Sequence, residues 1–342
     1  MEKRKNYNGI DVVKLLMALC VVAIHLTPFA MFGENVSFLF DKVLTRAAVP
    51  FFFCSSGFFL KMKLDRVTSN LEYKTQILKF AKRILFMYFL WTIIYLPCII
   101  FWFKAESQTL LSFFQKCIFD GSYLHLWYLP SVMIAGVLAA LLVRKIGTIK
   151  SLIIAIGVYI LGLLDTSYYG VIKNFEFQNF IREYDKIFIT TRNGIFFGLV
   201  FILLGFLAYE TKQKLSKSLL LLIVSIIGLF MEMYLLRSFG VARTYEGVLF
   251  SVPVTYFLLQ VAKEILLQDK EIYKSIRIVG VLVYLSHCWV DFTYSVLCYN
   301  ILHRTFCSMV RFIYTLIITV LISILIVKLQ KHKRFTWLRK LY

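Results

Sequence analysis

Residues 10–30, IDVVKLLMALCVVAIHLTPFA, form a run apolar enough to cross a membrane, yet the run carries a lysine and a histidine. At about 100° per residue, Lys14 and His25 fall within about 20° of one helical face and lie roughly 16 Å apart along the axis. They share a face but cannot touch. An ionisable group inside a span is costly, so it normally faces the interior of a helix bundle. The stretch therefore predicts a membrane helix with one functional face.

The composition extends this prediction to the whole chain. Of its 342 residues, 60% are hydrophobic and only 17% are charged, and the mean hydropathy is +0.75. Apolar windows recur at 10–30, 43–61, 79–103, 124–143, 149–164, 191–209, 218–236, 246–262, 278–298 and 306–327. We therefore expect an all-α integral membrane protein, a bundle of about ten transmembrane helices.

The formal charge of +20 could suggest a nucleic-acid partner, but the positions of the basic residues argue against one. Most of the 39 lysines and arginines lie in one set of alternate connections, at 3–5, 61–83, 144–150, 212–217, 263–277 and 328–340. This asymmetry is the positive-inside pattern, and it predicts that both termini are cytoplasmic. We expect a multi-pass protein of a bacterial-type plasma membrane whose basic side faces anionic lipid and which binds no nucleic acid.

Cysteine spacing and short motifs exclude several classes of site. The seven cysteines show no CxxC pair, and most lie inside apolar windows, so we expect apolar fillers, with no metal site and no disulfide framework. No Walker loop, GxGxxG or HExxH motif appears. No linker divides the chain, so residues 1–342 are expected to form a single membrane domain.

His25 and Lys14 each have a functional and a structural interpretation. His25 is either a packing histidine or a general base, since imidazole titrates near neutral pH and can take a proton from a hydroxyl. Lys14 either binds a ligand, pairs with Asp11 on the same face, or extends to the membrane interface.

Several polar residues are expected at the outer level of His25, where they would line one pocket for an acidic or oxyanionic ligand. The simpler interpretation of the aromatic and basic members is interface anchoring. The predicted substrate-binding residues are Arg46, Ser55, Ser56, His125, Trp127, Arg192 and Asn193. The aromatic and charged segment 165–190 is a possible lid over this pocket.

Three further positions are less specific. Lys79, Lys82 and Arg83 sit where the third span meets the cytoplasm, and they serve either as anchors or as a phosphate-binding cluster. His287 is expected to be a hydrogen-bonded core histidine. Glu232 must be protonated or paired with an unidentified partner.

The spacing Lys14-x10-His25 resembles the signature of acyltransferase family 3, a family of ten-helix membrane proteins. Four further motifs follow in the family's order: RAAVPFFFCSSGFF, HLWYLP, TRNGIFFGLVFILLG and VYLSH.

The resemblance implies transfer of an acyl group, usually acetyl from acetyl-CoA, to a hydroxyl of a cell-envelope sugar or a similar acceptor. His25 would then be the catalytic base. Asp11, Lys14, Lys79, Lys82 and Arg83 would form the coenzyme side of the site. The family's Arg-x-x-Arg is Lys79-x-x-Lys82 here, which keeps the charge but loses the bidentate fork.

Within the family, SYLHLWYLP, GVYILGLLDTSYYGVI and TTRNGIFFG look most like the membrane half of the vancomycin-resistance serine racemases. That resemblance implies an alternative function, the binding and import of L-serine for a cytoplasmic racemase domain that would follow residue 342. A third, non-catalytic possibility is a membrane anchor for a partner enzyme.

Overall fold

The computed structural model describes residues 6–105, 109–173, 176–265, 267–298, 303 and 307–342. These residues form helices joined by turns, with no strand among them, so the all-α expectation is confirmed. The chain separates into two compact units, residues 1–48 with 261–342 and residues 49–260.

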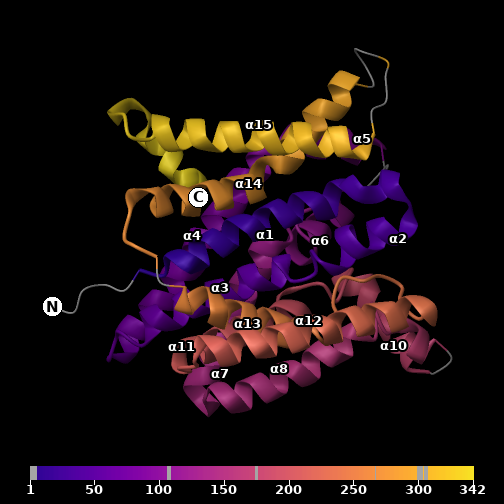
Figure 1. The fold of residues 1–342 in the computed structure, drawn as a ribbon, viewed down its shortest axis with the longest axis vertical. Helices are drawn as coiled ribbons and strands as arrows, with labels where there is room; N and C mark the ends of the chain where they lie inside the picture. The colour runs from indigo at the N-terminus through magenta and orange to yellow at the C-terminus, as the bar shows by residue number, and fades with distance from the viewer. Residues whose placement is uncertain (1–5, 106–108, 174–175, 266, 299–302, 304–306) are drawn as a thin grey trace. The chain divides into compact units, whose positions relative to one another are not determined.

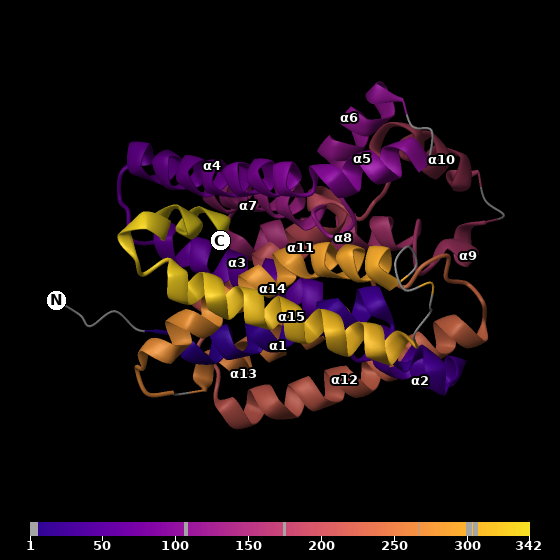
Figure 2. The same ribbon diagram turned by 90° about the horizontal axis from the view of Figure 1, so that it is seen from above.

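The first unit holds the helix that carries Lys14 and His25. Its main helices lie side by side in both Figure 1 and Figure 2, with α14 packed against α1 and against α15. Short helical turns follow α1 before the chain enters the second unit. The elements of the first unit are α1 (Asn8–Leu26), η1 (Pro28–Phe32), α2 (Glu34–Ser37), η2 (Phe38–Val43), α14 (Glu271–Val296), α15 (Ser308–Leu329) and η5 (Lys333–Leu341).

The second unit is built around the packing of α7, α8 and α11, and α4 lies along α7 (Figures 1 and 2). Its last helix, α13, runs across the boundary at residue 260. The elements are α3 (Ala48–Leu64), α4 (Asn70–Ile94), α5 (Leu96–Ala105), α6 (Leu110–Phe119), α7 (Tyr128–Ile146), α8 (Thr148–Leu163), α9 (Tyr169–Ile172), α10 (Phe177–Phe188), η3 (Gly194–Gly198), α11 (Leu199–Glu210), α12 (Leu215–Ser238) and α13 (Ser251–Glu264).

Two glycines allow α3 and α11 to approach closely. A methyl group on Gly57 would lie 2.2 Å from the carbonyl oxygen of Ile202, and one on Gly205 would lie 2.0 Å from that of Cys54. Small residues at a helix crossing let the backbones meet, which is the usual way in which membrane helices pack tightly.

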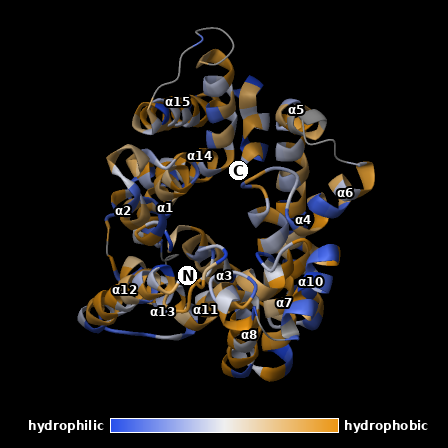
Figure 3. Cartoon of the chain, turned by 90° about the vertical axis from the view of Figure 1, so that its right-hand side faces the viewer, coloured by the Kyte–Doolittle hydropathy of each residue, from blue (hydrophilic) through white to orange (hydrophobic). Residues whose placement is uncertain are grey.

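Among the residues that the structure describes, six helical segments are long and apolar enough to cross a membrane: Asn8–Leu26, Glu34–Leu64, Tyr128–Ile146, Leu215–Ser238, Glu271–Val296 and Ser308–Leu329. Each of the ten predicted windows overlaps helical residues, but several of the helices are short, such as α8 with 16 residues. Figure 3 shows the hydrophobic colour prevailing on α8 and α12, whereas α10 is largely hydrophilic. These helices indicate a multi-pass membrane protein.

The third predicted window, 79–103, is not one helix. It is divided at Tyr95 into α4 and α5. Pro97 is the second residue of α5, and a proline in the middle of a continuous helix would remove a hydrogen bond and clash with the preceding turn. At its other end, α4 begins at an N-cap, where the hydroxyl of Ser69 accepts from the backbone N–H of Glu72.

Candidate functional site

The helices α1 and α14 pack in parallel, which sets which residues meet between them. Asn8 donates to the backbone oxygen of Gln268, and Leu15 lies against Gly280 further along. Still further along, the ring of His25 lies beside that of His287. Residue numbers rise together on both helices, so the two helices run in the same direction.

An ion pair with a buried acid joins the first turn of α1 to the second turn of α14. Both oxygens of Asp11 accept hydrogen bonds from Arg277, at 2.9 Å from Nε and 2.7 Å from Nη2. The Asp11 side chain is 1% exposed. A fork of this kind fixes both the distance and the rotation of the partners. The sequence analysis considered Lys14 as the partner of Asp11 and did not identify Arg277, which lies 266 residues away.

Lys14 and His25 lie on one unbroken helix, as the sequence predicts. Lys14 is half-buried and His25 is exposed, although Val21, Val22 and Leu26 are buried. The helix ends one residue after His25, because Thr27 adopts the left-handed conformation (φ 41°) ahead of Pro28. His25 therefore occupies the last turn of α1.

His287 is a buried, hydrogen-bonded histidine, as the sequence suggests, and it also lies beside His25. Its ring centroid is 5.2 Å from that of His25. The ring is fully buried, and Nδ1 donates to the backbone oxygens of Tyr284 at 2.8 Å and Val283 at 3.2 Å. The next residue, Cys288, has its thiol 3.2 Å from Nε2 of His287. The sequence analysis quoted VYLSH as a motif but gave no role to Cys288.

In the second unit, the guanidinium of Arg192 lies between two carboxylates. Nη1 donates to Glu246 at 2.6 Å, and Nη2 donates to Asp120 at 3.0 Å. Its central carbon sits 4.9 Å from the ring centre of Trp127, which is a cation–π distance. The structure thus brings together Arg192 and Trp127, as predicted, and adds two acids that the sequence analysis missed.

These two acids change what the Arg192 group can bind. One guanidinium and two carboxylates carry a formal charge of −1, so the group as a whole does not attract a simple anion. A zwitterion suits it better, because an ammonium can replace the guanidinium at one carboxylate while a carboxylate binds the guanidinium. The substrate-binding role of Arg192 stays a prediction.

The other predicted pocket residues of this unit contact neighbouring side chains or backbone within the protein. His125 is buried and meets the rings of Tyr95 and Tyr123 at centroid distances of 5.1 and 6.2 Å. Ser55 donates to the backbone oxygen of Phe52 in its own helix. Ser56 shares a hydrogen bond of 3.1 Å with the hydroxyl of Tyr128.

Asn193 serves as a helix cap. Its Oδ1 accepts from the backbone N–H groups of Ile195 and Phe196, and its Nδ2 donates to Tyr184 and to the backbone oxygen of Thr190. An amide offers two donors, and both of these are used within the protein. This arrangement gives Asn193 a structural role at the start of η3, and a ligand contact at this position stays a prediction.

The residues predicted to line one pocket are divided between the two units. His25 and Arg46 belong to the first unit, where Nε of Arg46 donates to the backbone oxygen of Lys42 one turn earlier. His125 and Arg192 belong to the second unit. The predicted phosphate cluster also lies in the second unit, on α4, where Lys79, Lys82 and Arg83 are all exposed.

The segment predicted as a lid folds into α9 and α10. Arg243 bonds to Asp165 at 3.0 Å and to Asp185 at 3.4 Å, which ties this segment to the connection before α13. Burial, and then the charge of Asp165, raise the pKa of the Asp185 carboxyl, whereas Arg243 acts to lower it. A cavity of about 540 Å³ lies here, lined by Tyr169, Ile181, Arg182, Asp185, Lys186 and Arg243. It contains none of the predicted site residues.

Glu232 has a structural partner. Its carboxylate accepts from the hydroxyl of Tyr168 and from the backbone N–H groups of Leu249 and Phe250. Those two N–H groups directly precede α13, so the acid caps that helix and interacts favourably with its dipole.

Residues 7–328 match the sequence family described as acyltransferase domain. The chain belongs to acyltransferase family 3. An amino-acid racemase of Enterococcus faecalis is 36% identical over 222 residues, which cover 64% of this chain and 30% of that protein. A serine/alanine racemase of Enterococcus gallinarum is 31% identical over 257 residues, covering 73% of this chain and 36% of that protein. No solved structure matches.

The family membership confirms the resemblance read from the five motifs, including its racemase subgroup. The chain spans about a third of the length of the curated relatives it matches. The roles of individual acyltransferase family 3 residues in this chain, His25 included, stay predictions.

Proposed function

We propose that the protein transfers an acetyl group from cytoplasmic acetyl-CoA to a hydroxyl acceptor near the outer face of a bacterial plasma membrane. The observation that carries the proposal is the position of His25, an exposed imidazole in the last turn of α1, 5.2 Å from the buried ring of His287. Only the exposed member of this pair is presented to an acceptor, so His25 is the base and His287 supports it.

The proposed reaction balances with one histidine acting as base and then as acid. His25 takes the proton of the acceptor hydroxyl as the oxygen attacks the thioester carbonyl carbon. The carbon–sulfur bond breaks, and the departing coenzyme thiolate receives the proton from the imidazolium. His287 cannot rotate, because its Nδ1 is bonded to two backbone oxygens, and it therefore gives His25 a fixed neighbour.

The coenzyme phosphates are assigned to basic residues of the inner side. Lys79, Lys82 and Arg83 are exposed on α4 and share one face, since residues three and four apart on a helix are neighbours. Lys14, on α1 of the first unit, is assigned to the coenzyme as the family resemblance implies. Asp11 is expected on the coenzyme side by the resemblance. Its two bonds to Arg277 support a structural role instead, in which it holds α1 against α14.

The direction of the two helices supports the proposed topology. We assign ten crossings with both termini in the cytoplasm. Helices that pack in parallel must cross the membrane in the same direction, and α1 and α14 would be the first and ninth crossings. With a cytoplasmic N-terminus, both run outward, so His25 and His287 lie toward the outer side.

A second candidate function is the binding and import of L-serine for a racemase domain. Two observations favour it: the curated relatives are named amino-acid or serine/alanine racemases, and Arg192 lies between Glu246 and Asp120. The ammonium and carboxylate of an amino acid are complementary to such a group.

One reconstitution separates the two functions. Proteoliposomes are loaded with acetyl-CoA, and labelled L-serine or peptidoglycan fragments are supplied outside. Acetyl transfer gives an O-acetylated acceptor and one released coenzyme thiol per product, and His25→Gln abolishes both. Import gives unmodified labelled serine inside the vesicles, and Arg192→Ala reduces it. Uptake of serine with no acetylated product from any acceptor would replace the first function by the second.

A further inference from the structure

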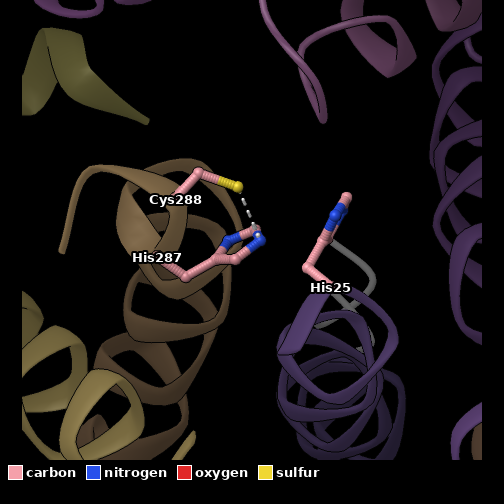
Figure 4. A group of neighbouring side chains, drawn as sticks. All are labelled: His25, His287 and Cys288. Atoms are coloured by element: carbon pink, nitrogen blue, oxygen red, sulfur yellow. Dashed lines mark hydrogen bonds between the residues drawn. The ribbon is translucent and has the colours of Figure 1, made fainter. Parts of the chain in front are cut away.

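Three metal-binding side chains gather where the last turn of α1 faces α14. One ligand atom from each of His25, His287 and Cys288 lies within 4.8 Å of the others. Figure 4 shows His287 and Cys288 reaching from α14 toward α1, with the ring of His25 opposite them. All three belong to the same compact unit.

The hydrogen bonds prepare this group for a cation. A carbonyl oxygen only accepts, so Nδ1 of His287 carries the hydrogen that bonds to Tyr284 and Val283. In the neutral ring, Nε2 then holds the lone pair, and it accepts the S–H of Cys288 at 3.2 Å. Metal-binding histidines almost always donate their other ring N–H to a carboxylate or a backbone oxygen in this way, which fixes the tautomer.

Burial adds to the suitability of the two residues from α14. His287 is fully buried and Cys288 is 5% exposed, so both are rigidly placed. The side chains of consecutive helix residues point about 100° apart, yet the thiol of Cys288 lies within hydrogen-bonding distance of the His287 imidazole. His25 is the exposed member of the set.

We propose that His25, His287 and Cys288 bind one Zn²⁺ ion. Two imidazole nitrogens and a thiolate are donors that Zn²⁺ prefers, whereas Mg²⁺ and Ca²⁺ require oxygen. Bond lengths of about 2.0 Å to nitrogen and about 2.3 Å to sulfur place tetrahedral donors about 3.5 Å apart. Nε2 and Sγ already meet this spacing. The widest pair closes by about 1 Å through rotation of His25.

Binding replaces the proton of the thiol. Sγ–H breaks, Sγ–Zn forms, and the proton leaves to solvent, so no oxidant or other reactant is needed. Three protein ligands leave a fourth position for water or another small ligand, as in catalytic zinc sites. The site does not rest on the acetyl-transfer proposal, but it shares His25 with it. A ring nitrogen of His25 that is bound to Zn²⁺ cannot act as the base, so the two roles belong to the metal-bound and the metal-free protein. The site departs from the sequence-based expectation of no metal.

The test uses the full chain without an affinity tag, purified in detergent and titrated with Co²⁺ as a spectroscopic substitute for Zn²⁺. We expect one Co²⁺ per chain, a sulfur-to-cobalt charge-transfer band, strong visible bands typical of a tetrahedral site, and displacement of the cobalt by Zn²⁺. Cys288→Ser removes the charge-transfer band, and His25→Ala weakens binding at least about tenfold. Cys307→Ser, which alters the exposed cysteine before α15, leaves the spectrum unchanged.

X-ray absorption of the zinc-loaded wild-type protein keeps the proposal testable if a variant fails to fold. The expected first shell contains sulfur at about 2.3 Å together with nitrogen at about 2.0 Å. A shell without sulfur, or a cobalt spectrum that survives Cys288→Ser, would overturn the site. Metal retention no greater than that of a detergent blank would do the same.

Discussion

Asp11 and Arg277 join the first turn of α1 to the second turn of α14 through two charge-assisted hydrogen bonds of 2.9 and 2.7 Å. The pair lies at one end of a parallel helix contact whose other end holds His25 and His287. Because a bidentate fork permits little sliding or rotation, it fixes the register in which the two histidines meet. The ion pair therefore stabilises the geometry of the candidate site from the other end of the helix contact.

Arg277→Ala should destabilise the protein. It leaves the buried Asp11 carboxylate without its fork, and we expect a loss of about 2 kcal/mol, below the range for fully buried pairs because Arg277 is half-exposed. The measurement is thermal unfolding in detergent. Lys274→Ala is the matched control, since Lys274 lies one turn earlier on α14 in an exposed pair with Glu271 and should cost little. Equal effects of the two changes would contradict the proposed role.

Gly57→Ala should force α3 and α11 apart. The new methyl group would lie 2.2 Å from a backbone oxygen, which cannot move aside as a side chain does. We expect a loss of about 1–3 kcal/mol, measured by thermal or denaturant unfolding.

Gly157→Ala is its control, because a methyl group at this position of α8 would meet nothing within 4 Å. Alanine favours a helix over glycine by about 1 kcal/mol, so this change should be neutral or stabilising. A stable Gly57→Ala protein would show that the contact between α3 and α11 is looser than described.

The helices were predictable because long apolar runs leave few other structures for a chain in lipid. The break at Tyr95 was missed because hydropathy does not register that Pro97 must begin a new helix. The partners of the polar groups were not predictable. Arg277 is 266 residues from Asp11, and Asp120 and Glu246 lie far from Arg192 in sequence. Their charges identify them as candidates, but only the fold selects among the many acids and bases.

The candidate site shows the same division. Helical periodicity placed Lys14 and His25 on one face, since it needs only the local repeat. The group around His25 also needs α14, where VYLSH gave a family motif but no geometry. The sequence did not identify Cys288, because only the neighbouring imidazole of His287 distinguishes it from the other cysteines.

Asp185→Asn should stabilise the protein at neutral pH. Burial and Asp165 raise the pKa of the Asp185 carboxyl, so the folded chain holds that proton more tightly than the unfolded chain. Stability therefore falls as pH rises from the ordinary pKa through the raised one, and the ionised carboxyl remains a cost above it. Asparagine removes this cost and flattens the curve, which unfolding temperatures between about pH 4 and about pH 7 can measure.

Asp165→Asn provides the contrast. Asp165 is buried, and it accepts from both Arg243 and Thr191. Removing its charge weakens two bonds at once, so it should lower the unfolding temperature at neutral pH. If Asp185→Asn lowered that temperature by as much, the unfavourable burial of Asp185 would be refuted.

Lys14 and His25 should affect different kinetic constants, because the acetyl-transfer proposal assigns them to different steps. His25→Gln removes the base and should lower kcat by about 10²–10⁴-fold with little change in the KM for acetyl-CoA. Lys14→Gln removes a contact to the coenzyme and should raise that KM while largely preserving kcat. Lys14→Arg keeps the charge and should restore most of the affinity.

Lys150→Gln, at an exposed lysine of α8, is the control and should alter neither constant. A Lys14→Gln protein with normal KM and lowered kcat would place the lysine beside the reacting atoms instead of beside the coenzyme.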